Sequence, residues 1–130
     1  MKTIQTQGTR KQAVARATLR TGKGKVTVNK QYLHDFQSKS AQLRITEPMI
    51  LAGDAAKKVD IDILVKGGGV NGQTDASRVA IARALVAHDR SLKKVFDDYD
   101  RLLLVADVRR KETRKPNDSK ARAARQKSYR

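Results

Sequence analysis

The last 23 residues of the chain, 108–130, limit what this sequence can fold into. Between Val108 and Tyr129 the segment has no apolar side chain larger than Ala apart from Pro116, so it has nothing to bury in a core. It carries ten Lys or Arg residues and two acids, a net charge of +8. Such a segment is predicted to be disordered when the chain is free in solution. The folded core must therefore come from residues 1–107.

The rest of the charge is also unevenly distributed. Residues 1–34 carry eight Lys or Arg and no acid, whereas residues 35–107 carry eleven basic and eleven acidic residues. The net charge of +16 is thus the sum of +8, 0 and +8. Like charges on a short segment repel one another, and a polyanion removes that repulsion while it releases its own counterions. Nucleic acid is therefore the expected partner. An anionic membrane fits less well, because neither end has the bulky apolar face that insertion needs.

The core is expected to be small, aliphatic and organised as one domain. Only 38% of the residues are hydrophobic and 4% are aromatic, and the absence of Cys excludes a disulfide framework and a thiolate metal site. The sequence has no apolar run long enough to span a membrane, and its first residues lack the apolar segment of a signal peptide. We expect a soluble cytoplasmic protein.

The first half of the chain combines strand patterns with one helix signal. Residues 13–19 and 25–28 place small or apolar side chains at alternate positions, which predicts strands. The glycine-containing segment 21–24 between them predicts a hairpin with Arg and Lys on one face, suited to RNA. A hydroxyl, an acid and a proline at residues 46–48 predict the start of a helix that runs towards Lys57.

The clearest strand follows, over residues 59–65, and the glycine-rich run 67–72 ends it. Thr74 or Asp75 is expected to cap a helix over residues 76–88, which has an apolar face.

Two further elements complete the expected core. A shorter helix is predicted to begin at Ser91 and end near Phe96, and residues 101–105 predict a buried strand. The order strand, glycine loop, helix, strand indicates a crossover between parallel strands, added to an N-terminal antiparallel sheet. We expect an α+β domain, a mixed β-sheet with helices on one face, over residues 1–107, and an extended basic C-terminal tail over residues 108–130.

The glycine run allows three interpretations. Gly67, Gly69 and Gly72 match the spacing of a dinucleotide-binding turn. That site needs an acid about 20 residues later, at the end of a second parallel strand, whereas residues 88–91 are predicted to lie between two helices. A backbone that approaches a phosphate of RNA, at the start of a helix, is favoured instead. A tight turn without a ligand remains the alternative.

The acids and histidines give little support to catalysis. Asp60 and Asp62 share one face of a strand and would suit a metal or an acid–base pair, but the solvent face of a half-buried strand requires the same residue types. The acidic segment 97–100 is interpreted as solvated surface. His34 and His88 have no Cys or evident Ser elbow as a partner in the sequence, so an enzyme is disfavoured.

The tail has more Arg than a solubilising tail requires, although that function remains the alternative. Arg forks pair with phosphates and stack on bases. Fully extended, the segment reaches about 70 to 80 Å, so it can thread through folded RNA to a place that the core does not touch. Tyr129, next to Arg130, can stack on a base or a ribose.

The chain contains the motifs GTRKQAVARA at residues 8–17 and VKGGGVNGQ at residues 65–73, followed by AIARAL at residues 80–85 and by the basic tail. Together these three motifs resemble the family of small ribosomal subunit protein nine, over essentially the full length of the chain. The closing residues 127–130 are similar to the archaeal and eukaryotic form, since bacterial members typically end in Ser-Lys-Arg and Tyr129 departs from that pattern.

The resemblance implies a non-enzymatic component of the head of the small subunit, with the fold of the second domain of ribosomal protein five. It implies binding to small-subunit ribosomal RNA, neighbouring ribosomal proteins as partners, no membrane, no small-molecule substrate, no metal and no cofactor. It also implies that the tail reaches the anticodon stem-loop of peptidyl-site tRNA through Ser128, Tyr129 and Arg130. The residues expected to bind ribosomal RNA are Arg10, Lys11, Arg16, Lys66, Gly67, Gly68, Gly69, Arg109, Arg110, Lys111, Arg114, Lys115, Lys120, Arg122 and Arg125.

Overall fold

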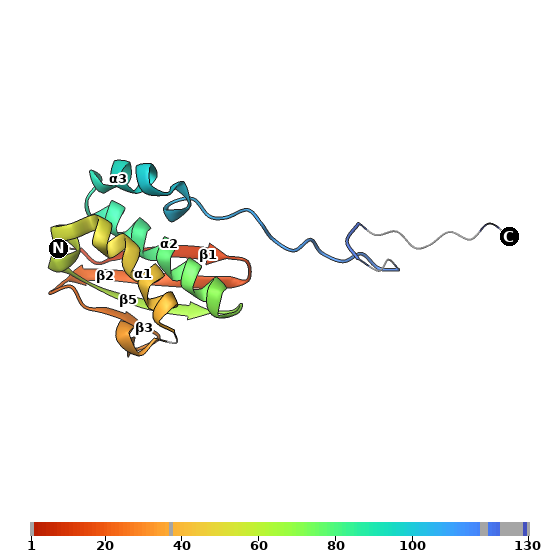
Figure 1. Cartoon of the computed structure of the whole chain (residues 1–130), viewed down its shortest axis with the longest axis horizontal. Helices are drawn as coiled ribbons and strands as arrows, with labels where there is room; N and C mark the ends of the chain where they lie inside the picture. The colour runs from red at the N-terminus through yellow and green to blue at the C-terminus, as the bar shows by residue number, and fades with distance from the viewer. Residues whose placement is uncertain (1, 37, 118–119, 123–128, 130) are drawn as a thin grey trace.

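The computed structural model describes residues 2–36, 38–117, 120–122 and 129. Its elements are β1 (Ile4–Arg10), β2 (Ala13–Thr21), β3 (Val26–Val28), β4 (Gln31–Tyr32), η1 (Leu33–Asp35), α1 (Lys39–Ala52), η2 (Gly53–Lys58), β5 (Val59–Lys66), α2 (Val70–His88), α3 (Leu92–Tyr99) and η3 (Arg101–Leu103). Within the described residues, the five strands form one sheet in the order β1-β2-β5-β3-β4. Helices α1 and α2 cover one face of this sheet, and α3 packs against both helices (Figure 1). The predicted α+β class, with a mixed sheet and helices on one face, is confirmed.

The connection between β2 and β3 differs from the prediction. The expected hairpin is wrong, because β5 lies between these two strands, antiparallel to β2 and parallel to β3. The N–H groups of Gly22 and Gly24 donate to backbone carbonyls at the start of β5, so the glycines carry the chain past that strand. The Asp60 carboxylate holds the same segment, since it accepts from the backbone N–H groups of Lys23 and Lys25 at 2.9 Å each.

Helix α1 begins well before the predicted start. Ser38 caps it, because the hydroxyl oxygen accepts a backbone N–H of the first turn at 3.2 Å. Thr46 lies in the helix interior and donates to a carbonyl one turn earlier, and Pro48 also lies inside the helix with its ring buried. The predicted start at residue 46 is therefore wrong. Pro48 cannot donate a hydrogen bond inside the helix, and burial of its ring offsets part of that cost. The α-helix ends before Gly53, whose φ is +60°, and it does not reach Lys57 as an α-helix.

Helix α2 also begins earlier than expected. Gly69 is its N-cap residue, so a cap at Thr74 or Asp75 is wrong. The buried hydroxyl of Thr74 donates instead to the Val70 carbonyl at 2.8 Å, inside the helix. The predicted end at His88 is confirmed.

The segment after α2 contains a second correction. Helix α3 begins directly after Ser91, as predicted, and ends later than expected. The strand predicted over residues 101–105 is wrong, because the Asp100 carboxylate accepts the N–H of Leu102 at 3.0 Å and nucleates the short 3-10 helix η3. Leu103 is buried by that turn rather than by a sheet. The expected crossover after the glycine loop is therefore wrong as well, and in the described sheet β3 and β5 are the parallel pair, connected through α1.

Small residues allow α2 to lie close to the β1–β2 hairpin. A Cβ atom on Gly8 would lie 2.2 Å from the Ala76 carbonyl oxygen and 2.6 Å from the Ala80 backbone nitrogen. The Thr6 hydroxyl donates to the Ala80 carbonyl at 2.8 Å. The neighbouring strand β2 contributes fully buried alanines to the same contact, at Ala13, Ala15 and Ala17.

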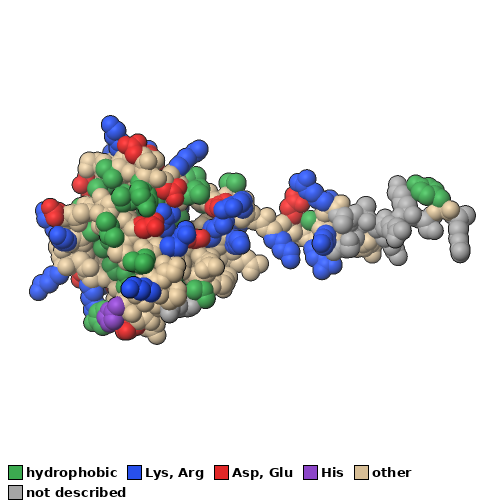
Figure 2. All heavy atoms as spheres, viewed as in Figure 1, with side chains coloured by type: hydrophobic (Ala, Val, Ile, Leu, Met, Phe, Trp, Pro, Cys, Tyr) green, Lys and Arg blue, Asp and Glu red, His purple; other side chains and the backbone are tan. Residues whose placement is uncertain are grey.

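After η3 the described chain leaves the core. Residues 108–117 and 120–122 contain neither helix nor strand, and they run away from the sheet as an extended segment (Figure 1). Lys and Arg side chains crowd along the described part of this segment (Figure 2). The division into a core of residues 1–107 and a tail of residues 108–130 stays a prediction, since part of the tail lies outside the described residues.

The contact at Gly8 predicts a steric effect on stability. The variant Gly8→Ala should lower the free energy of unfolding by about 1 to 3 kcal/mol, because its methyl group would overlap the backbone of α2. Urea denaturation measures this change. The comparison variant is Gly69→Ala, since a Cβ there would meet no described atom within 4 Å. It should lower the free energy of unfolding by less than Gly8→Ala, because it changes only the N-cap of α2. Equal effects of the two substitutions would contradict the close packing of α2.

Candidate nucleic-acid interface

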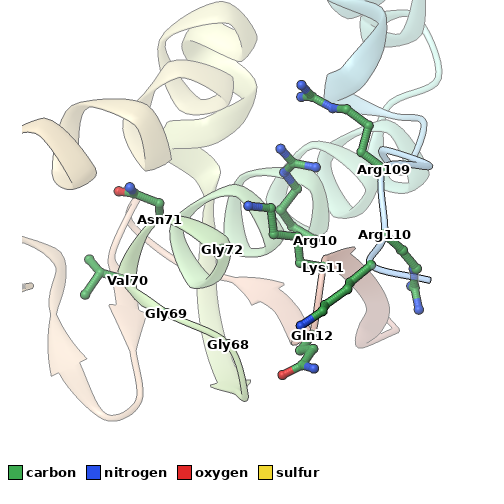
Figure 3. Close-up of a pocket in the computed structure, with 11 residues that line it drawn as sticks. Arg10, Lys11, Gln12, Gly68, Gly69, Val70, Asn71, Gly72, Arg109 and Arg110 are labelled. Carbon is green, nitrogen blue, oxygen red and sulfur yellow. The ribbon is translucent and has the colours of Figure 1, made fainter. Parts of the chain in front are cut away.

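Two basic segments and the glycine loop meet at one end of the sheet. The β1–β2 turn, the loop after β5, the first turn of α2 and the start of the tail line a hollow of about 970 Å³ (Figure 3). The sequence predicts RNA contacts for each basic segment and for the glycine loop, and the fold brings them together. We call this site the cationic hollow, lined by Arg10, Lys11, Gln12, Gly68, Gly69, Val70, Asn71, Gly72, Arg109, Arg110 and Lys111.

The glycines allow the loop to lie against the β1–β2 turn. Gly67 and Gly68 have φ angles of +80° and +66°, a region that other residues rarely adopt. A Cβ atom on Gly67 would lie 2.6 Å from the Gln12 carbonyl oxygen. The side-chain amide of Gln73 donates to the Gly67 carbonyl at 3.2 Å and joins the loop to α2. The first turn of α2 therefore lines the hollow, where backbone N–H groups without an intrahelical acceptor favour an anion.

The β1–β2 turn presents a lysine at the edge of the hollow. Arg10 pairs with Ala13 across the hairpin, which leaves Lys11 and Gln12 as the two turn residues. Lys11 has a φ of +54° and is exposed. Figure 3 shows the turn between the start of the tail, with Arg109 and Arg110, and the glycine loop.

An ion-pair cluster fixes the place where the tail leaves the core. The Asp107 carboxylate lies 2.8 Å from Arg10 Nη1 and 2.7 Å from Arg109 Nη2. Asp75 lies 3.6 Å from Arg10 Nε and 2.9 Å from Arg44 Nη2. The hydrogen bonds that the Arg109 side chain and backbone donate, with the charge of Arg10, lower the pKa of Asp107 to about 2. The cluster thus joins β1, α1, α2 and the tail.

Two further arginines, one buried and one half-buried, connect the elements around this ion-pair cluster. Arg83 donates to the Leu104 carbonyl at 2.9 Å and to the Gln7 carbonyl at 2.7 Å, so it links the segment after η3 to strand β1. The buried Arg78 pairs with Glu47 at 2.6 Å and with Asp100 at 3.3 Å. Sequence reasoning missed these residues and Asp107. A charged residue on the apolar face of a helix is the signal that could have found Arg78 and Arg83.

The predicted RNA-binding residues of the core and of the first part of the tail differ in exposure and in ion pairing. The Arg10 side chain is 15% exposed and paired with Asp107 and Asp75, so its visible contacts are intramolecular. Lys11, Lys66, Arg110 and Lys111 are exposed and make no ion pair with another described residue. Lys66 directly precedes the glycine loop.

Arg16 lies elsewhere. It is exposed on the sheet face opposite the helices, paired across the sheet with Leu64, and it does not line the hollow.

The described part of the tail is basic and exposed. Arg114, Lys115 and Lys120 are exposed, and Arg122 pairs with Glu112 at 2.7 Å. Tyr129 is 91% exposed. The predicted contacts of Arg125, Ser128 and Arg130 lie outside the described residues.

The acids considered for catalysis have other partners. Asp60 holds the Lys23–Lys25 backbone, and the N–H of Lys25, followed by that of Lys23, lowers the pKa of Asp60. Asp62 accepts from the Thr27 hydroxyl at 2.6 Å. Among the described residues, no group of three or more His, Asp or Glu side chains could hold a metal ion. In the same part of the chain, no helix is long and apolar enough to cross a membrane.

The Asp107 cluster predicts a pH-dependent contribution to stability. The folded-state pKa of Asp107 lies below its ordinary value of 3.8, so its ion pairs stabilise the fold above that pH and are lost as the pH falls towards 2. Asp107→Asn should therefore unfold more easily than the original chain at pH 5 to 7, and the difference should shrink between pH 4 and 2. Urea denaturation over this pH range measures it. The control Glu112→Gln, in the exposed tail, should leave stability unchanged, and a pH-independent difference for Asp107→Asn would contradict the cluster.

Comparison with known proteins agrees with the resemblance seen in the sequence. A model of the family described as ribosomal protein S9/S16 matches residues 8–130. The small ribosomal subunit protein uS9 of Methanococcus maripaludis strain C7 is 47% identical over 134 residues, which cover 100% of both chains. The protein of the same name from Methanococcus vannielii is 45% identical over 134 residues, again with 100% of both chains covered. Both relatives are archaeal, in agreement with the form predicted from the closing residues. The chain belongs to the ribosomal protein S9/S16 family.

Proposed function

We propose that the chain binds small-subunit ribosomal RNA through the cationic hollow. As a family member it is a structural component of the small ribosomal subunit, works in translation and is part of cytoplasmic ribosomes. The observation that carries the proposal is the convergence of the β1–β2 turn, the start of the tail and the glycine loop on one hollow.

An RNA phosphate fits the hollow in charge and in shape. Lys11, Arg110 and Lys111 supply exposed cations around it. A Cβ atom on Gly69 would meet no described atom within 4 Å, so the outer side of the loop is open to a close backbone approach. The N–H groups of the first turn of α2 add to the attraction. Contacts of this kind position a protein on RNA without reading its sequence.

The tail extends the same interface. We propose that residues 108–130 lie in a groove of ribosomal RNA. There the phosphates attract the Lys and Arg side chains, which repel one another when the tail is free. The ion pairs of Asp107 with Arg10 and Arg109 fix the start of the tail against the core. Because this part of the tail is already ordered, RNA binding costs less conformational entropy. The residues proposed to contact RNA beyond the hollow are Arg16, Lys66, Gly67, Arg114, Lys115, Lys120, Arg122 and Arg125.

The end of the tail is proposed to contact tRNA. In this proposal the core lies in the head of the subunit, beside other ribosomal proteins, and the tail reaches the anticodon stem-loop of peptidyl-site tRNA. Ser128, Tyr129 and Arg130 would make that contact. The exposed ring of Tyr129 supports it, because an exposed aromatic ring can stack on a base or a ribose.

We propose a non-enzymatic protein that needs no cofactor. The dinucleotide-binding alternative requires a second parallel strand after α2, whereas in the described residues α2 is followed by α3 and η3. Gly72, the third glycine of that pattern, lies inside α2. Micromolar binding of NAD or ATP in a calorimetric titration would support a nucleotide-dependent enzyme instead. Equal affinity for duplex DNA and folded RNA would support a general DNA-binding protein.

The hollow predicts a change in salt dependence. The double variant Lys11→Gln/Arg110→Gln should bind a small-subunit ribosomal RNA fragment more weakly, because two phosphate contacts are lost. The slope of log K against log salt concentration should fall in magnitude by about 2. Fluorescence anisotropy between 50 and 300 mM KCl measures both quantities.

A matched control keeps the same loss of charge away from the hollow. Lys93→Gln/Lys94→Gln removes two exposed lysines from α3 and should leave the slope close to that of the original chain. Equal changes in the two double variants would show that net charge, rather than the hollow, determines binding.

The tail predicts an effect on tRNA that is separate from assembly. Removal of Ser128–Arg130 should leave the chain in the small subunit, because the hollow is intact, while peptidyl-site tRNA dissociates several times faster. Filter binding of labelled tRNA to purified subunits measures the dissociation rate. Unchanged retention of tRNA in the truncated subunits would contradict the proposed contact.

A further inference from the structure

A second group of cations lies outside the cationic hollow. Residues 23–39 contain four lysines and one acid, Asp35, and none of them is among the described residues that line the hollow. This segment covers the loop before β3, then β3, β4, η1 and the start of α1, at the β4 edge of the described sheet. The lysines are Lys23, Lys25, Lys30 and Lys39.

A groove of about 460 Å³ lies between α1 and the β3–β4 segment. Its size is within the range of cavities that accept small organic groups. Basic, aromatic and aliphatic side chains line it together, among them Lys25, Tyr32, His34, Lys39, Leu43 and Met49.

Three of these side chains form an exposed stack. Lys25 Nζ lies 4.7 Å from the centre of the Tyr32 ring. The Tyr32 and His34 rings are 5.5 Å apart between centroids and nearly parallel, at 18°. The His34 side chain is 75% exposed and Tyr32 is 49% exposed. Flat rings that are stacked but open to solvent can accept another flat ring.

We propose that this groove binds an unpaired nucleotide of RNA, with its base stacked on the His34–Tyr32 rings and its phosphates paired with Lys25 and Lys39. The inference rests on the proposed RNA-binding function and adds a second contact with a different preference. Aromatic platforms bordered by cations recognise unstacked bases, because every base has a π face and every nucleotide a phosphate. The lysine excess at the rim favours an anionic partner over an apolar protein surface, and the exposed ring stack favours an anion that carries a flat base.

The segment that carries the Tyr32 and His34 rings is held in place by α1 in the absence of a ligand. The Gln42 side-chain amide of α1 donates to the His34 carbonyl at 3.1 Å and to the Phe36 carbonyl at 2.6 Å. Phe36 is buried, which holds the far end of η1 in the core. A stack held in this way loses little conformational entropy when a base binds.

The test compares two probes on the full chain. The probes are a 12-nucleotide RNA without self-complementarity and the blunt duplex that it forms with its complement. Tyr32→Leu/His34→Leu should bind the single strand about tenfold more weakly and the duplex with unchanged affinity, because the paired bases of a duplex are not free to stack. The control is Tyr99→Leu on α3, since Tyr99 is 55% exposed and is not among the described residues that line the groove. This variant should bind both probes like the original chain.

The outcomes separate this inference from the proposed function. If the original chain fails to bind small-subunit ribosomal RNA, the proposed function is wrong. If it binds that RNA and the Tyr32→Leu/His34→Leu variant keeps full affinity for the single strand, only the groove proposal is overturned. A photoreactive residue in place of Leu43 in assembled subunits gives a second measurement. Crosslinks to RNA support the proposal, and crosslinks to a protein overturn it.

Discussion

The close contact between α2 and the β1–β2 hairpin is the constraint on which the rest of the structure depends. Gly8 leaves no room for a Cβ atom beneath the helix, and buried alanines of β2 continue the same narrow contact. This packing sets the start of α2, and with it the glycine loop, beside the β1–β2 turn. A larger side chain at position 8 would push the helix away, and Lys11 would no longer share a hollow with Gly68 and Gly69. Packing of small residues in the core thus determines the geometry of the charged site.

The chain uses its cations in two ways. Buried or half-buried arginines such as Arg10 and Arg78 are matched by carboxylates, because a charge removed from water without a partner is costly. Lys11, Arg110 and Lys111 stay exposed and have no described ion-pair partner, so their charge is available to a polyanion. The carboxylates therefore fix the place where the tail leaves the core. The remaining cations, without a described partner, form the surface that is available to RNA.

The sequence predicted those elements whose cause is local. The strand ending at Lys66 has strict alternation, and α3 begins directly after Ser91. The starts of α1 and α2 and the turn at Asp100 are local features that the predictions missed. The other errors fall where contacts between distant parts of the chain determine the structure. Gly22 and Gly24 cross β5 instead of making a hairpin, because Asp60, far along the chain, accepts their neighbours' N–H groups. At the site, the sequence predicts an RNA contact for each basic segment and for the glycine loop, but it does not predict that they lie together. Their convergence depends on strand order, and the Asp107 and Arg83 contacts depend on tertiary packing, neither of which a local pattern contains.

A cryo-electron microscopy structure of the small subunit that contains this chain would test the central claim most directly. The account predicts that Lys11, Arg110 and Lys111 lie within ion-pairing distance of ribosomal RNA phosphates, with the backbone of Gly68 and Gly69 against the same strand. A map in which the cationic hollow faces solvent or another protein, with RNA bound elsewhere on the chain, would contradict it.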